Sequence, residues 1–479
     1  MRNNIIIALL QKHFQLLINI GSVLVLSRLI SPEETGVFSI GVAIAALTHA
    51  LRDFGVGNFL IKEMEITLEK INTAFTISLA IAIVLSIVLF AIAGPVADFY
   101  AKPEVATIIG ISTVGLLISP FSTISLSLMV RNQQFARMFP VSISGAICNA
   151  STAITLGWLG FGAKALAMGQ LASAIIIVVV ANLRGYQPGM YRISFQHWRR
   201  ISQFGAHTTA FGIAEQIGQR ANDLIVGKLL GFSAVGLLSR SGTLITMMQE
   251  SVMQAAMPVV LSTMAEQNRK DGDVTPQLRK SLEYFTLIVW PFFIVLGIFS
   301  LDVVRVLFGE KWLAAAPYTS ILCAGACFAV MSSPLSTICN ATGRVDLLSR
   351  YGAIVQGTRI TLIFGAALQG SLYTVALALV VADAIQSMIA YRIAHAITGI
   401  SLRQIATACW RSLAVAAIVA GVSLLLSWLL PASPALRVPL IAATATVTWL
   451  ASVYMVGHPV VGDLAVITKA AAARLQYRR

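Results

Sequence analysis

One predicted helix carries most of the polar side chains that could bind a ligand. It spans residues 201–227, and at 100° per residue its polar and small side chains fall on a single stripe. The stripe consists of Gly205, Thr209, Gly212, Gln216, Gln219, Arg220 and Asp223, and Glu215 and Asn222 widen it. An arginine guanidinium group can donate two parallel charge-assisted hydrogen bonds to phosphate oxygens. The stripe therefore predicts a face of the helix that contacts water or a polar ligand rather than lipid.

The composition of the chain places this stripe in a membrane. Of the 479 residues, 57% are hydrophobic and only 11% are charged, and the mean hydropathy is +0.82. A soluble domain is about 25% charged, so most side chains here must be solvated by lipid. The net charge of +14 comes from basic residues in short loops between apolar segments. That pattern is typical of membrane orientation and excludes nucleic acid as the expected partner.

Signatures of enzymes and of metal sites are missing from the sequence. There is no G-x-x-x-x-G-K-[ST] phosphate loop, no nucleophile elbow and no His or carboxylate cluster with metal-ligand spacing. All five cysteines fall inside apolar segments, where cysteine usually acts as a small buried hydrophobe. We therefore expect no catalytic residue, no metal and no cofactor.

A charged side chain inside a bilayer needs either a partner or a water-filled cavity, because it costs about 2.5–3.5 kcal/mol there. Arg220 and Asp223 lie one turn apart and could simply neutralise each other. The many uncharged polar residues beside them favour the second interpretation, a water-filled cavity. In that case Arg220 binds the anion, while Asp223 and Glu215 take up a proton or a coupling cation.

Other helices are predicted to support Arg220. The helix at 5–26 has its own polar stripe, in which Asn19 corresponds to Gln219 after a shift of 200 positions. Lys12 and Arg359 are the predicted supporting cations, and Arg240 is expected nearer the outer leaflet, on the release side. Each arginine could instead belong to a structural ion pair. The predicted substrate-binding residues are Arg220, Lys12, Arg359, Arg240, Gln216, Gln219 and Asn19.

The apolar segments predict an all-α polytopic membrane protein with about fourteen spans, each near the roughly 20 residues needed to cross. The span cores are 5–26, 37–54, 71–94, 105–130, 138–158, 164–183, 201–227, 233–260, 281–300, 314–340, 351–368, 371–391, 405–430 and 438–456. We predict four parts: a six-helix lobe at 1–185, a basic cytoplasmic linker at 186–200, a second six-helix lobe at 201–398, and two extra helices with a basic tail at 399–479.

The distribution of basic residues predicts the orientation. With the N-terminus inside, the cytoplasmic segments hold 24 of the 34 Lys and Arg residues, the outer loops hold 7, and 3 lie within spans. This asymmetry predicts that both termini are cytoplasmic.

Two sequence echoes predict that the lobes are duplicates. Residues 226–239 repeat the pattern of residues 26–39, so that Arg28 falls on Lys228 and Gly36 on Gly236. A second echo pairs residues 119–124 with 333–338. Because six spans separate the copies, both enter the membrane in the same sense. The two lobes should therefore be related by a pseudo-two-fold axis along the membrane normal.

The first half also resembles a known family. The segments Arg28-Leu-Ile-Ser-Pro-Glu-Glu-Thr-Gly-Val-Phe38 and Asp53-Phe-Gly-Val-Gly-Asn-Phe-Leu-Ile-Lys62 resemble the polysaccharide-transporter family. These are Wzx-like flippases of the multidrug/oligosaccharidyl-lipid/polysaccharide (MOP) superfamily. The resemblance extends over the twelve-span core and implies two six-helix lobes around a central cavity, lined by the first and seventh spans.

The resemblance also implies a substrate and a location. The substrate would be an oligosaccharide on undecaprenyl pyrophosphate, moved across the bacterial inner membrane to the periplasmic leaflet for exopolysaccharide, capsule or O-antigen synthesis. Membrane lipid, a polysaccharide polymerase and export proteins would be the partners. The alternative is a cation-coupled drug antiporter of the same superfamily. Acidic residues would be expected to dominate the cavity of such an antiporter, whereas here basic residues match them.

Overall fold

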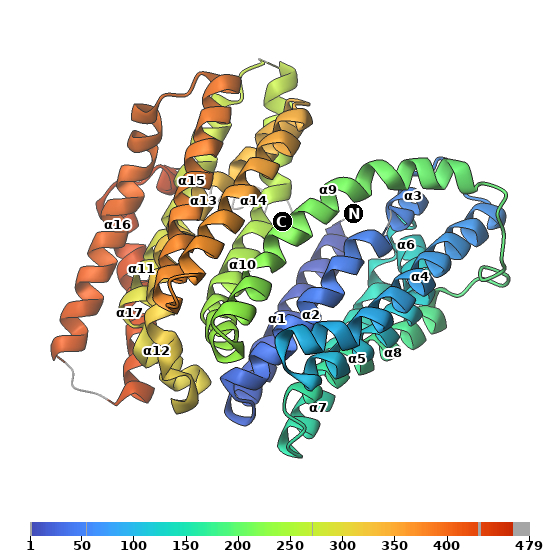
Figure 1. The fold of residues 1–479 in the computed structure, drawn as a ribbon. Helices are drawn as coiled ribbons and strands as arrows, with labels where there is room; N and C mark the ends of the chain where they lie inside the picture. The colour runs from blue at the N-terminus through green and yellow to red at the C-terminus, as the bar shows by residue number, and fades with distance from the viewer. Residues whose placement is uncertain (1, 54, 271, 430–432, 463–479) are drawn as a thin grey trace, which may run out of the picture. The chain divides into compact units, whose positions relative to one another are not determined.

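The computed structural model describes residues 2–53, 55–270, 272–429 and 433–462, and over these residues it is helical without a strand (Figure 1). The first half contains α1 (Arg2–Leu29), α2 (Pro32–Asp53), α3 (Val56–Lys62), α4 (Leu68–Tyr100), α5 (Pro103–Ile118), α6 (Pro120–Arg131), α7 (Phe135–Trp158) and α8 (Ala163–Gly185). The second half contains α9 (Trp198–Leu229), α10 (Phe232–Lys270), α11 (Thr275–Ile298), α12 (Ser300–Phe308), the 3-10 helix η1 (Glu310–Ala315), α13 (Ala316–Ala341), α14 (Val345–Ala367), α15 (Leu372–Thr398), α16 (Leu402–Leu429) and α17 (Pro434–Met455).

Each predicted span coincides with helical structure. Within the described ranges, eight helices are long and apolar enough to cross a membrane, or nine segments if the bent pair α5 and α6 counts as one span. The helices α1, α2, α9, α10 and α14 are 22 to 39 residues long but are not in this group. They include the two helices predicted to carry polar stripes. The all-helical, multi-pass architecture is confirmed, and the count of fourteen spans stays a prediction.

The span predicted at 105–130 is not one straight helix. It breaks at Ser119, and α5 and α6 meet at an angle of 49°. Pro120 opens α6, and a proline ring clashes with the preceding turn and removes a backbone donor, so a continuous helix is disfavoured there. The short helices α3 and α12, which hydropathy did not indicate, lie at the ends of longer ones.

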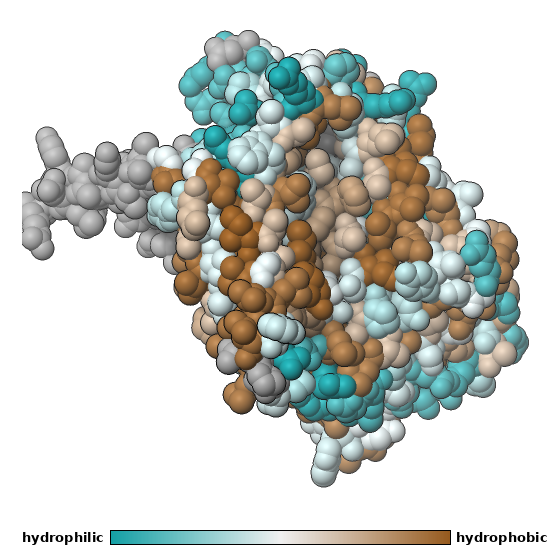
Figure 2. Space-filling model, turned by 90° about the vertical axis from the view of Figure 1, so that its left-hand side faces the viewer, coloured by the Kyte–Doolittle hydropathy of each residue, from teal (hydrophilic) through white to brown (hydrophobic). Residues whose placement is uncertain are grey.

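The surface is apolar over a broad middle zone. Figure 2 shows hydrophobic side chains gathered across the middle of the face that includes α16, with hydrophilic side chains concentrated toward the two ends. This pattern is typical of helices whose outer faces contact lipid chains and whose ends reach the headgroups.

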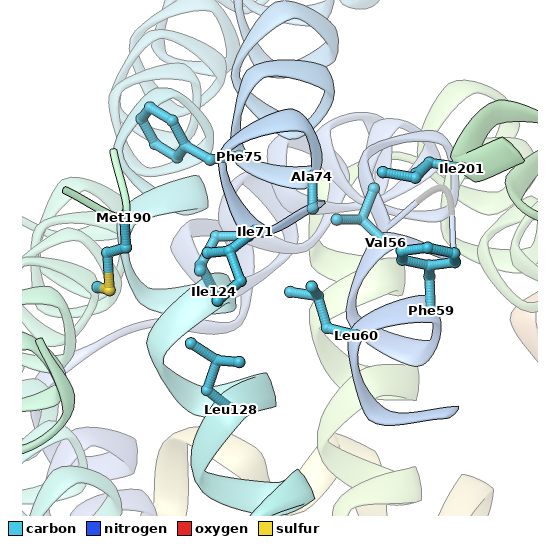
Figure 3. Close-up of a cluster of buried hydrophobic side chains, with 10 residues drawn as sticks. All are labelled: Val56, Phe59, Leu60, Ile71, Ala74, Phe75, Ile124, Leu128, Met190 and Ile201. Atoms are coloured by element: carbon cyan, nitrogen blue, oxygen red, sulfur yellow. The ribbon is translucent and has the colours of Figure 1, made fainter. Parts of the chain in front are cut away.

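The chain divides into two compact units, of which the first contains Met1–Ser239 and Ile363–Leu372. One apolar cluster of this unit joins α3, α4 and α6 to the predicted linker through Met190 and to the start of α9 through Ile201 (Figure 3). Beside it, the Tyr191 hydroxyl donates a hydrogen bond of 2.7 Å to the Phe121 carbonyl oxygen. The linker is therefore fixed to the first lobe by both apolar and polar contacts.

The second compact unit contains Arg240–Leu362 and Tyr373–Arg479, and in it α11 packs against α13 and α16. The Thr286 hydroxyl of α11 donates to the Ser412 hydroxyl of α16 at 2.9 Å. Trp449 Nε1 of α17 donates to the Leu287 carbonyl oxygen at 2.9 Å, and Arg437 pairs with Asp302 at 3.0 Å. The two helices predicted as additions to the core are thus fixed to it by specific polar contacts.

Candidate functional site

The polar stripe of α9 contains buried polar atoms that no described residue satisfies. Arg220 Nε, Gln216 Oε1 and Asn222 Oδ1 are shielded from solvent and have no hydrogen-bond partner in the described part of the chain. A buried polar atom without a partner costs about 1–3 kcal/mol. Several such atoms within two turns of one helix suggest a place for water or for a ligand, as the sequence pattern predicts.

Asp223 compensates the positive charge of Arg220 only in part. The two groups are near enough to interact electrostatically, and Asp223 also interacts with the hydroxyl of Tyr100. Among the described residues, however, Arg220 forms no ion pair within 4.0 Å, and its Nε stays unpartnered. The Nε–H of Arg220 is therefore available to another acceptor. Gln219 is exposed, and the side chain of Glu215 lies outside the described part of the chain.

The predicted supporting residues of α1 are accessible. Lys12 and Asn19 are both exposed, on a helix that packs mainly against α7. By contrast, α9 packs mainly against α2. No hydrogen bond or ion pair joins Lys12 or Asn19 to the described side chains of α9. Their role as ligands stays a prediction.

Arg240 is a buried cation held by aromatic rings. Only 8% of its surface is exposed, and its guanidinium carbon lies 4.6 Å from the ring centroid of Trp312 and 5.3 Å from that of Phe308. Its Nε has no hydrogen-bond partner within the described residues. Stacking on two rings stabilises the charge through their negative faces, so Arg240 is rigidly placed. Its predicted contact with substrate on the release side remains a prediction.

Arg359 belongs to an ion pair, one of the two alternatives open from the sequence. Its Nη1 lies 3.7 Å from Asp383 Oδ1, which joins α14 to α15. Asp383 in turn lies close to Gly325 of α13, where an added Cβ would be 2.8 Å from its Oδ2. Since its charge is already compensated, Arg359 is a weaker candidate for a phosphate ligand than Arg220.

The turns between α1 and α2 and between α9 and α10 touch each other reciprocally. A Cβ on Gly36 would lie 1.8 Å from the Phe232 carbonyl oxygen, and a Cβ on Gly236 would lie 1.8 Å from the Pro32 carbonyl oxygen. Residues 32 and 36 correspond to 232 and 236 in the sequence echo. Residue 36 thus contacts 232 as residue 236 contacts 32, which is the pattern that a local two-fold axis between the two turns would produce. Only glycine allows the two backbones to come this close.

The local sequence of each turn stabilises the backbone conformation that this contact needs. Ser31 and Glu34 form a capping box, with the Ser31 amide donating to Glu34 Oε2 at 2.8 Å and the Glu34 amide to Ser31 Oγ at 3.3 Å. Pro32 opens α2 at its first position. At the other turn, Gly231 has a φ of +87°, which favours glycine.

Side chains around the glycine contact hold the same two turns together. Lys102 Nζ lies 2.7 Å from Glu33 Oε1 and 6.0 Å from the ring centroid of Phe232. The Tyr100 hydroxyl donates to the Leu224 carbonyl oxygen at 3.0 Å. Lys228 donates to the Phe99 carbonyl oxygen. In the predicted topology all these groups lie at the outer end of the first unit.

Sequence reasoning missed this contact, although the signal was present. The echo placed Gly36 on Gly236, but equivalence alone does not indicate that two residues touch. A glycine at the same place in both copies was the available clue, because glycine allows another backbone to approach closely.

Comparisons with known proteins support the fold. Lipid II flippase MurJ in an inward closed conformation has a TM-score of 0.76 at 14% identity, covering 94% of this chain and 98% of that one. A multidrug resistance MATE transporter of the MOP superfamily, inward-facing, has a TM-score of 0.65 at 14% identity, covering 81% and 96%. These likenesses show that the chain has the fold of the MOP superfamily.

Sequence comparisons add the family. Lipopolysaccharide biosynthesis protein WzxC of Escherichia coli (strain K12) is 22% identical over 397 residues, which are 81% of this chain and 79% of that protein. Succinoglycan biosynthesis transport protein ExoT of Rhizobium meliloti (strain 1021) is 24% identical over 299 residues, 62% and 60% of the two chains. Residues 25–317, more than half of the chain, match the family described as "Polysaccharide biosynthesis protein". This multi-pass membrane chain therefore belongs to that family of polysaccharide biosynthesis proteins.

Proposed function

We propose that this chain is a flippase for lipid-linked oligosaccharide. It moves undecaprenyl-pyrophosphate-linked repeat units across the bacterial inner membrane for the synthesis of exopolysaccharide, capsule or O-antigen. The observation that carries the proposal is the buried Nε of Arg220, which has no hydrogen-bond partner among the described residues, on a helix with other unsatisfied polar atoms nearby. A diphosphate inside a membrane protein needs cationic donors of this kind.

The relatives support the substrate class. WzxC, ExoT and a teichuronic acid biosynthesis protein, TuaB of Bacillus subtilis, are all named for the synthesis or transport of surface polysaccharides. Of the two solved structures described above, the one with the higher TM-score is that of a lipid II flippase.

The chain would work by alternating access. Arg220 holds the pyrophosphate, and the amides of Gln216, Gln219 and Asn222 contact the glycan. Release on the periplasmic side then requires that the turns at Gly36 and Gly236 separate. The substrate changes sides without a change of covalent structure. The unequal distribution of basic residues supports an orientation with both termini in the cytoplasm.

A cation-coupled antiporter of small molecules is the second candidate. The MATE-like fold and Asp223, close to Arg220, favour it. The two functions predict different phenotypes in cells that lack this protein. We expect cells without it to accumulate lipid-linked oligosaccharide with the glycan in the cytoplasm, at unchanged drug sensitivity. Normal turnover of that intermediate together with drug hypersensitivity would overturn the flippase assignment.

A further inference from the structure

An apolar groove of about 700 Å³ lies on the first compact unit, away from the polar stripe of Arg220. Its floor is a face of α4 that includes Ala80, Ile81 and Val84, and Ser202 at the start of α9 closes one end. Phe195 and Trp198 of the linker form one wall. In the predicted topology, the groove lies at the cytoplasmic surface of the membrane.

The linker holds this wall in place. The Ser194 amide donates to the Thr76 hydroxyl of α4 at 2.9 Å, and the Thr73 hydroxyl donates to that of Ser194 at 3.2 Å. Next to these anchors, Phe195 is 63% and Trp198 is 49% exposed. Two large aromatic side chains are thus fixed by the backbone beside them while their rings stay uncovered. An exposed, positioned apolar wall is a feature of binding sites and of membrane interfaces.

One cation lies beside the wall of the groove. The Arg199 guanidinium carbon lies 5.7 Å from the ring centroid of Trp198, which lines the groove, and Arg199 is exposed. An apolar floor next to an exposed guanidinium group is complementary to a lipid that carries phosphate. Bulk bilayer lipid needs no such fixed partner.

One helix carries both a residue that lines the groove and the residue proposed to hold the pyrophosphate. Ser202 and Arg220 lie on the same helix, 18 positions apart, which is about 27 Å at a rise of 1.5 Å per residue. A lipid whose chain lies in the groove would have its headgroup at Arg199, at the start of the helix that carries the polar stripe.

We propose that this groove is the loading site for the polyprenyl chain of the substrate. The first isoprene units lie against α4, Phe195 and Trp198, while Arg199 holds the diphosphate before it passes along α9. The proposal rests on the function proposed above and adds the site at which the lipid part is recognised. It commits to a prenyl diphosphate as the occupant and makes ordinary bilayer lipid an outcome of the test.

The test uses the full chain in nanodiscs of phosphatidylcholine, with undecaprenyl diphosphate and geranyl diphosphate as probes. Val84→Trp fills the groove at a position that is 58% exposed, so it should fold; Ala80→Trp is a second filling variant. Ile83→Trp is the matched control, because Ile83 is exposed on α4 but does not line the groove. We expect both filling variants to weaken binding of undecaprenyl diphosphate about fivefold, through lost packing, and the control to leave it unchanged. Arg199→Gln should weaken binding of both diphosphates.

The outcomes separate this proposal from the function on which it rests. If folded Val84→Trp bound undecaprenyl diphosphate as well as the unaltered chain, while Arg220→Ala still abolished transport, only the proposed loading site would be overturned. If the unaltered chain bound neither diphosphate, both proposals would fall. Binding of a spin-labelled phosphatidylglycerol provides the comparison with ordinary lipid. If Val84→Trp weakened its binding as much as that of undecaprenyl diphosphate, the groove would take ordinary lipid, and the loading site would be overturned.

Discussion

Gly36 and Gly236 each lie against the carbonyl group of the residue that opens the other's helix, so the contact is reciprocal. Gly36 opposes Phe232, and Gly236 opposes Pro32, the equivalent residue of the first copy. Close approach of two helices through small residues allows Cα–H···O contacts and dense packing. At the glycines the contact is made by backbone, so no side chain has to change its rotamer there when the turns separate; the surrounding contacts of Lys102, Tyr100 and Lys228 must break as well.

Substitution of either glycine should prevent closure. We expect Gly36→Ala and Gly236→Ala each to slow polysaccharide export about tenfold, because an added Cβ would meet a carbonyl oxygen at 1.8 Å. The double variant should be little worse than a single one, since both changes disrupt one contact. Labelling of an introduced Val235→Cys, buried in this structure, by an impermeant maleimide reports the opening. Gly242→Ala is the control, because nothing lies within 4 Å of its Cβ.

Arg220 should be sensitive to the geometry of its charge. Arg220→Ala should abolish export, because about 1.5–3 kcal/mol is lost with each hydrogen bond to a charged group. Arg220→Lys keeps the charge but loses the paired donors, so export should fall only partly. Export rates at normal expression, with protein amounts measured in the membrane, check this. Full export by Arg220→Ala combined with misfolding of Asp223→Asn would show that the two residues form a structural pair.

The Arg359–Asp383 ion pair should contribute to stability rather than to binding. Asp383→Asn leaves a guanidinium without its counter-charge inside the helix bundle, and we expect it to lower the melting temperature in detergent. Arg359→Gln combined with Asp383→Asn should recover most of that loss, because the uncompensated charge is gone. Export lost in the double variant while its melting temperature recovers would contradict a purely structural role.

His458 should make the stability of the chain depend on pH. It lies beyond the end of α17, is 1% exposed, and its Nε2 contacts the Ser412 hydroxyl at 3.3 Å. Burial, aided by the charge of Arg411, lowers the pKa of His458 below its usual 6.5. Above pH 6.5 the ring is neutral in both folded and unfolded chains. As the pH falls below 6.5 the unfolded chain binds a proton first, so stability decreases.

The measurement is the melting temperature in detergent between pH 7.5 and pH 5.5. We expect it to fall over that range, and His458→Gln to reduce the slope. A slope that is the same in the variant would assign the pH dependence to other groups.

Orientation is tested by single cysteines. Cysteines at Lys102 and Lys164 should react with an impermeant thiol reagent added to the periplasm, because both residues lie in predicted outer loops. Cysteines at Arg192 and Lys270 should be protected until the membrane is opened. The opposite pattern would reverse the predicted orientation and would move the glycine contact to the cytoplasmic end.

The positions of the helices were accessible from the sequence because hydropathy measures directly what lipid requires. The same pattern could not indicate the break at Ser119–Pro120 or the helices α3 and α12, which depend on local backbone geometry. For the candidate site, the polar stripe of α9 could be predicted because helical periodicity places residues on one face.

Partners from distant parts of the chain could not be predicted in this way. Arg240 stacks on Trp312 and Arg359 pairs with Asp383, and no local rule connects these positions. The sequence therefore indicated which residues are unusual in lipid but not which of them are already compensated. That distinction separates Arg359, which has an ion-pair partner, from Arg220, for which none is found among the described residues; the ligand role of both stays a prediction.

The polar contacts between α11 and the last two helices have a consequence for truncation of the chain. Glu283 and Thr286 of α11 are buried, and Ser412 of α16 contacts both Thr286 and His458, which follows α17. Removing α16 and α17 would take away these partners and bring polar groups of α11 closer to lipid, at a cost in insertion. A chain shortened to the first twelve predicted spans should therefore insert poorly unless positions 283 and 286 became apolar as well.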